Sequence, residues 1–83
     1  MKIYAIKDTK AGFIIRPIMH PNDAVAVRDF TNLVNNSNEL NQIAMNYTDF
    51  ELWHIADFDQ DTGVITPCLE FLVNGSNVKK VEV

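Results

Sequence analysis

The first eighteen residues alternate in a way that predicts two short strands. Residues 2–8 and 13–18 are rich in β-forming side chains, and the segment between them ends at Gly12, which can adopt positive φ. Pro17 has no N–H, so it is expected at a sheet edge or at the end of its strand. This pattern predicts an N-terminal β-hairpin.

The segment after His20 changes to the spacing of an amphipathic helix. Asn22 is a suitable N-cap, and Asp23 lies in the first turn, where the helix dipole favours a negative charge. Ala26 flanks an apolar stripe that consists of Val27, Phe30, Leu33 and Val34. The polar run 35–38 is expected to end this helix, which is the main one.

The second half of the chain predicts a short helix followed by a second hairpin. A helical turn or two is expected within 39–46, behind Asn38 as the cap. Residues 49–58 are expected to form a strand, 59–62 an acidic turn, and 63–67 or beyond the returning strand. Asn-Gly at 74–75 is typical of a type I′ turn and predicts a further strand or a terminal hairpin.

These elements predict one small α+β domain spanning residues 1–83. An antiparallel sheet of two β-hairpins is expected to pack on one main helix, with a short second helix. Such an open sheet has exposed edges, so we expect a homodimer or a higher oligomer formed by strand addition.

Composition is that of a folded globular protein, with 47% hydrophobic and 10% aromatic residues. No apolar run reaches the length needed to cross a bilayer, so no membrane association is expected. The single cysteine, Cys68, has no partner within the chain for a disulfide, which favours a reducing, cytoplasmic setting.

The charges are separated along the chain. The formal net charge is −4, whereas nucleic-acid-binding domains are usually basic. Residues 1–20 nevertheless carry four basic side chains against one acidic one, and residues 49–70 carry six acidic side chains and no Lys or Arg. The sequence therefore predicts a basic N-terminal hairpin and an acidic second hairpin.

Catalytic and metal-binding patterns are weak in this sequence. Aspartates at 57, 59 and 61 alternate as in a calcium loop, but glycine comes one position late and Cys68 stands where a bidentate Glu is needed. His54 is expected on the sheet face opposite Trp53, and a Cys68–His54 nucleophile pair has no supporting signature. We expect neither a metal, nor a cofactor, nor an enzyme.

Binding chemistry is the better-supported alternative. Aromatic side chains at 4, 13, 53 and 58 could form a stacking face, as in proteins that bind single strands, or could simply fill the core. Basic side chains from the first hairpin would then follow the nucleic-acid backbone. The residues predicted to contact nucleic acid are Lys2, Tyr4, Lys7, Lys10 and Arg16.

Several segments resemble the small nonstructural protein of gokushovirus-type microviruses, which are single-stranded DNA phages. The resemblance is carried by the start at 1–4, the helical segment 26–30, and residues 49–53 continuing into Phe58-Asp59 and 62–65. It implies a non-virion phage protein of the bacterial cytoplasm that assists single-stranded DNA synthesis or handling. It implies no enzyme activity and no catalytic residues.

Two mechanisms are compatible with this resemblance and with the acidity of the chain. In the first, an oligomer gathers the basic hairpins along single-stranded DNA, with steep salt dependence. In the second, an acidic hairpin docks on a phage or host replication protein through Asp57, Asp59 and Asp61. An adaptor that acts by edge-strand pairing alone is a third alternative.

Overall fold

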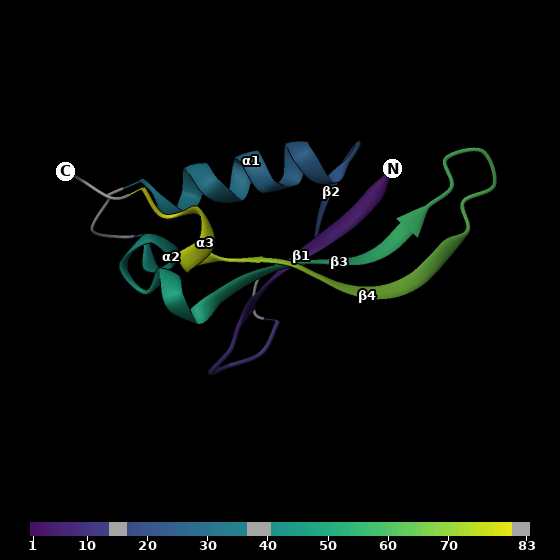
Figure 1. Cartoon of the computed structure of the whole chain (residues 1–83). Coiled ribbons are helices and arrows are strands. Elements are labelled where there is room, and N and C mark those ends of the chain that lie inside the picture. Colours follow the sequence, from purple (N-terminus) through teal and green to yellow (C-terminus); the bar gives the residue numbers. More distant parts are fainter. Residues whose placement is uncertain (14–16, 37–40, 81–83) are drawn as a thin grey trace.

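The computed structural model describes residues 1–13, 17–36 and 41–80, and it has the predicted α+β architecture. Four antiparallel strands form one sheet in the order β2-β1-β3-β4, and α1 lies across one face of it (Figure 1). The strands are β1 (Lys2–Asp8), β2 (Ile18–His20), β3 (Phe50–Phe58) and β4 (Ile65–Asn74). The helices are α1 (Asp23–Val34), α2 (Gln42–Met45), the 3₁₀ turn η1 (Tyr47–Asp49) and α3 (Gly75–Val78).

The first hairpin closes later than the sequence predicts. β1 has the predicted bounds and Gly12 has a φ of 95° in the turn, but the returning strand is β2 at 18–20 rather than 13–18. Tyr4 pairs with Ile18 and Lys2 with His20, so pairing begins only after Pro17. Residues 14–16 lie outside the described part of the chain. Because β2 is an edge strand, the missing N–H of Pro17 costs no ladder bond.

The main helix is capped as predicted, but the face that it buries is rotated slightly from the predicted apolar stripe. The Asn22 side chain accepts a hydrogen bond from the Val25 N–H. The buried residues of α1 are Ala26, Phe30 and Val34, whereas Leu33 is exposed. These side chains pack on Tyr4, Ile6, Phe50 and Leu52 from the sheet. The core therefore lies between α1 and one sheet face, and parts of α2, η1 and α3 pack against the same cluster.

The short helix α2 is capped by Asn41, whose side chain accepts from the Ala44 N–H. The predicted cap, Asn38, lies outside the described residues. No helix in the described part of the chain is long and apolar enough to span a membrane.

The expected type I′ turn at 74–75 is wrong. Asn74 caps α3 instead, by accepting from the Ser76 N–H at 2.8 Å, and Gly75 does not have positive φ. A Cβ added to Gly75 would lie 2.0 Å from the carbonyl oxygen of Tyr47. Glycine is therefore needed at position 75 because the Tyr47 backbone approaches it closely. The described residues after α3 contain no further strand.

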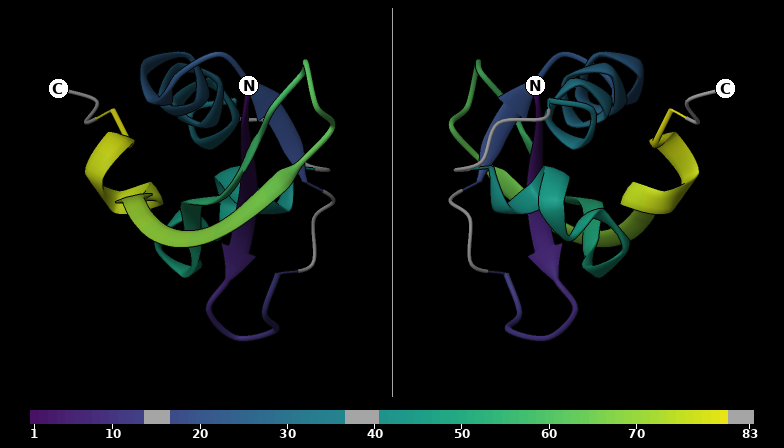
Figure 2. Two further views of the ribbon diagram at one scale, coloured as in Figure 1. Left: turned by 90° about the vertical axis from the view of Figure 1, so that its right-hand side faces the viewer. Right: turned by 90° about the vertical axis from the view of Figure 1, so that its left-hand side faces the viewer.

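The second hairpin projects beyond the helices in Figure 1, and the end-on views of Figure 2 show how β4 curves from that hairpin towards α3. β3 and β4 run antiparallel, and the acidic turn between them ends at Gly63, which has a φ of 77°. Two shifts in register between β3 and β4 bend the outer strand. The molecule is accordingly elongated, with extents of 47 × 25 × 20 Å.

Candidate nucleic-acid interface

Three aromatic side chains gather on the sheet face away from α1. Trp53 of β3 pairs across the strands with Phe71 of β4, and their ring centroids are 5.7 Å apart at 72°. Phe13, just after the first turn, lies 6.1 Å from Trp53 at 79°. Phe13 and Phe71 are 47% and 48% exposed. These three residues form an aromatic platform that the described elements leave partly open.

A lysine is held over the platform. The Nζ atom of Lys7 lies 5.6 Å from the Phe13 ring centroid and 5.4 Å from that of Trp53. Both distances are within the range of cation–π attraction. The Trp53 indole N–H donates to Oε1 of Glu51 at 3.1 Å, which orients the indole ring. The platform therefore combines fixed aromatic rings with one positive charge.

The predicted basic residues do not gather in one groove within the described ranges. Lys2 lies 3.4 Å from Asp23 of α1, on the helix side of the sheet, whereas Lys7 lies over the platform. Lys10 lies in the first turn, 3.5 Å from Asp49. Arg16 is outside the described residues. Among the members of the predicted set that the structure describes, only Lys7 is brought against aromatic rings on the open face.

Tyr4 was assigned wrongly as an accessible contact residue. Its side chain is 0% exposed, and its hydroxyl donates to Oδ1 of Asp23 at 2.6 Å. Burial, followed by the bond to Asp23, raises the pKa of Tyr4. The same hydrogen bond, with help from Lys2, lowers the pKa of Asp23. Tyr4 therefore joins β1 to α1 and offers no ring face to a base.

The sequence did not single out Phe71. It lies in β4 beyond Pro67, and only the strand register places it against Trp53. Phe58, which was considered for stacking, pairs instead with Ile65 near the hairpin tip. No short-range signal in the sequence reveals the partnership of Trp53 and Phe71, since it depends on a register shift between β3 and β4.

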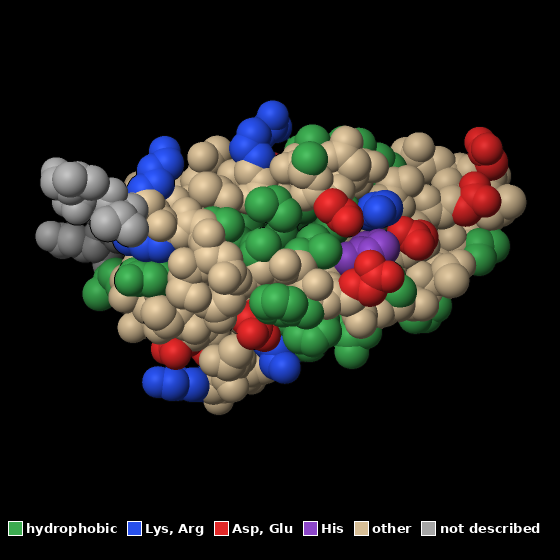
Figure 3. Space-filling view, in the orientation of Figure 1, with side chains coloured by type: hydrophobic (Ala, Val, Ile, Leu, Met, Phe, Trp, Pro, Cys, Tyr) green, Lys and Arg blue, Asp and Glu red, His purple; other side chains and the backbone are tan. Residues whose placement is uncertain are grey.

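A second polar cluster surrounds His54 on the helix side. This histidine lies on the sheet face opposite Trp53, as expected, and its side chain is buried there, at 4% exposed. Its Nε2 atom lies 2.9 Å from Oδ1 of Asp57 and 3.1 Å from the carbonyl oxygen of Ala56, so Nε2 carries a proton. Its Nδ1 atom lies 3.5 Å from Glu70. Figure 3 shows charged side chains around a histidine on this side.

Cys68 is not activated by this cluster. Its Sγ atom contacts the backbone oxygen of His54 at 3.6 Å rather than the imidazole ring. Burial and the nearby Asp57 and Glu70 carboxylates raise the pKa of the thiol. A raised pKa keeps the sulfur protonated near neutral pH, which is opposite to what a nucleophile requires.

The aspartates of the acidic hairpin make different contacts. Asp57 contacts His54, whereas Oδ1 of Asp59 accepts from the backbone N–H groups of Asp61 at 2.9 Å and Thr62 at 3.3 Å. These backbone bonds lower the pKa of Asp59. The described residues contain no group of three or more His, Cys, Asp or Glu placed to hold a metal ion. Asp59 therefore stabilises the turn itself.

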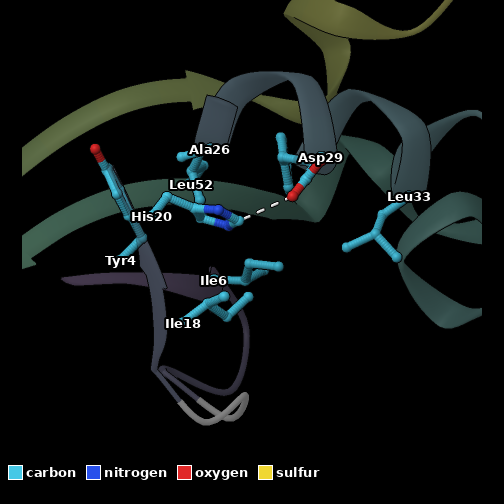
Figure 4. A pocket seen from close by; sticks show the side chains of 9 residues that line it. Tyr4, Ile6, Ile18, His20, Ala26, Asp29, Leu33 and Leu52 are labelled. Carbon is cyan, nitrogen blue, oxygen red and sulfur yellow. Dashed lines mark ion pairs between the residues drawn. The ribbon is translucent and has the colours of Figure 1, made fainter. Parts of the chain in front are cut away.

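A small cavity lies between β1, β2 and α1 (Figure 4). Apolar side chains such as Ile6 and Leu52 line it, and His20 Nε2 lies 3.6 Å from Asp29 Oδ2 beside it. Its volume of ≈ 20 Å³ is enough for about one water molecule and far below the several hundred Å³ of a small-molecule site. This cavity therefore does not provide a ligand site.

Comparison with known proteins places the chain in a phage family. Residues 1–78 match the family described as Phage ORF5 protein, so the chain belongs to that family. No curated protein and no solved structure matches the chain. The earlier expectation of a phage protein is confirmed at this level.

Proposed function

We propose that this member of the Phage ORF5 family is a microvirus-type accessory protein that binds single-stranded DNA on the open face of its sheet. In this proposal it acts in the bacterial cytoplasm, outside the virion, by binding rather than by catalysis. It assists the synthesis or handling of the single-stranded genome. The observation that carries the proposal is the aromatic platform of Phe13, Trp53 and Phe71 with Lys7 above it.

The placement of the platform suits unpaired bases. A four-stranded sheet that is covered by helix on one face and presents aromatic rings on the other is a known arrangement for stacking single-stranded bases. Stacking tolerates any sequence, because every base has a π-face. Duplex DNA hides its base faces, so the platform would discriminate in favour of single strands.

The charge distribution sets the expected salt dependence. Lys7 lies over the platform and Lys10 lies in the turn that follows β1, while the net charge of −4 opposes any long electrostatic contact. Two phosphate contacts on a single strand give a slope of log K against log salt of roughly −1.4. The structure therefore favours weak, stacking-dominated binding with a shallow slope, in place of the steep dependence expected from four gathered cations.

The only tryptophan of the chain provides a direct test, because Trp53 lies in the platform. Titration with oligothymidylate should quench Trp53 fluorescence as bases stack on the indole, in parallel with a rise in the anisotropy of a labelled oligonucleotide. Phe71→Ala should weaken the affinity about 5- to 150-fold, the range expected for one lost stacking contact. Met45→Ala, at another exposed apolar side chain on α2, is the matched control and should change nothing.

Two outcomes would sink the DNA proposal. One is a folded protein whose fluorescence and anisotropy are unaffected by single strands at low salt. The other is binding that Phe71→Ala and Met45→Ala leave equally unchanged.

A protein partner is the second candidate function. The observation in its favour is the projecting hairpin (Figure 1), whose acidic tip is exposed at Asp59 and Asp61. Such a tip could dock on a basic surface of a phage or host replication protein. Loss of partner capture in Asp61→Lys, with Trp53 fluorescence still insensitive to DNA, would favour this candidate over the first.

A further inference from the structure

The outer strand β4 is the long open edge of the sheet. The opposite edge, β2, has 3 residues, whereas β4 has 10 and is exposed over most of residues 65–71. Glu70 is the only charged residue of β4. Long edges with few charges are sites of strand addition, because their outward N–H and C=O groups are available to another strand.

The exposed side chains of this strand are also apolar. Leu69 is 65% exposed and Ile65 57% exposed, and Val64 precedes them at 56%. Large apolar side chains gathered on one exposed strand indicate an interaction surface more than solitary ones do. Because β4 runs beyond α1 in the projecting hairpin, the described helices do not cover them (Figure 1).

The two ends of β4 carry opposite charges. Its N-terminal end follows the acidic turn with Asp59 and Asp61, and its C-terminal end leads through α3 to Lys79 and Lys80. The hairpin tip and α3 lie at opposite ends of the molecule in Figure 1. Two copies that run antiparallel along β4 therefore place each acidic tip near the basic segment of the other copy.

We propose that β4 pairs with β4 of a second copy of this chain, antiparallel and about a two-fold axis near Leu69. A pairing centred on Leu69 joins two apolar side chains at the axis. A pairing centred on Glu70 would instead set two carboxylates opposite each other, which destabilises cross-strand contact.

Pro67 and the bends of β4 limit the extent of this pairing. Pro67 has no N–H, and the two register shifts with β3 interrupt the regular ladder. The backbone hydrogen bonds between copies are therefore few. The apolar contact at Leu69 and the attraction between the oppositely charged ends supply much of the interaction. This makes the dimer moderate in affinity and dependent on concentration.

The pairing has a consequence for the aromatic platform. A two-fold axis perpendicular to the sheet keeps both open faces on the same side, so the two platforms would form one extended surface across eight strands. That consequence rests on the proposed DNA binding, whereas the dimer itself does not. Each subunit would then add its few stacked bases to a common path.

Sedimentation velocity of the full chain over a range of micromolar concentrations tests the pairing. Wild type should pass from monomer to dimer, and Leu69→Lys should remain monomeric. Met45→Lys, which adds the same charge at an exposed site on α2, should dimerise like wild type. Asp61→Lys and Lys79→Asp should each weaken the dimer, and the double variant should recover it. Such recovery would not occur if the two residues acted only on the folding of their own subunit.

A wild-type chain that stays monomeric at high micromolar concentration would overturn the proposal. A dimer that Leu69→Lys leaves intact while its circular dichroism is native would also overturn it. Trp53 quenching by DNA in a monomeric protein would reject the pairing and keep the DNA proposal. A Leu69-dependent dimer that gives no quenching would do the reverse.

Discussion

The two faces of the sheet use similar residues for opposite purposes. On the helix side, Tyr4 is buried and its hydroxyl is bonded to Asp23. On the other side, Trp53 and Phe71 stay partly exposed beside Lys7. Each face has an aromatic residue near a charge, but only the helix side encloses it. The comparison shows that the covering element, rather than the residue type, decides whether an aromatic stabilises the fold or remains available for binding.

The largest difference between the faces should appear in stability. Phe30 is 1% exposed in the core, so Phe30→Ala should lower the free energy of unfolding by about 3–5 kcal/mol. Phe71→Ala on the open face should cost much less, because the ring is already half in solvent. Urea unfolding followed by circular dichroism measures both. Equal losses would show that the open face is packed as tightly as the core.

The close contact at Gly75 should give the next effect. Gly75→Ala sets a Cβ against the Tyr47 carbonyl, and α3 or η1 must shift to relieve it. We expect a loss of about 1–3 kcal/mol in unfolding free energy, as for other overpacked sites. Gly63→Ala is a useful comparison, since nothing lies within 4 Å of its added Cβ and any cost there comes from φ alone. A neutral Gly75→Ala would contradict the structural reason for glycine.

The smallest effect should come from the Tyr4–Asp23 hydrogen bond. Tyr4→Phe removes the hydroxyl and should cost about 1 kcal/mol, because the Asp23 carboxylate is half exposed and keeps Lys2 beside it. Tyr4→Phe keeps the ring, so the apolar packing of β1 against α1 should survive. Urea unfolding at neutral pH measures the difference. No change would mean that the bond contributes nothing beyond packing.

The same bond predicts a stability window in pH. The folded state lowers the pKa of Asp23, so its contribution is present above about pH 4 and is lost as pH falls through the folded value. The folded state raises the pKa of Tyr4, so that contribution is present below about pH 10 and is lost as pH rises. Unfolding measured from acid to alkaline pH should be flatter in Tyr4→Phe at both limits.

Local patterns were enough to predict most elements. The bounds of β1, the Asn22 cap of α1, the glycine-closed turns and the second hairpin all depend on residues close to one another in sequence. The α+β class followed from their order. Asn74-Gly75 was misread because its usual turn conformation gave way to capping of α3 and to the approach of Tyr47, which lies far away in sequence.

The candidate site was only half predictable. Lys7, Phe13 and Trp53 were recognised as types that bind nucleic acid, but Tyr4 was placed with them and Phe71 was missed. β1 has apolar side chains on both alternating sets, so its pattern does not say which set faces the helix. Phe71 reaches Trp53 only through the register of β4.

By itself, the sequence determined β1, the second hairpin, the main helix, the acidic turn and the phage resemblance, because each rests on local spacing or on a contiguous motif. The tertiary structure decided which face of β1 is buried, which charges are paired across elements, and that three aromatic rings meet, two of them beneath Lys7. Those outcomes depend on strand register and on which face α1 covers. Both are set by packing energies summed over residues distant in the chain, and no short window of sequence contains that sum.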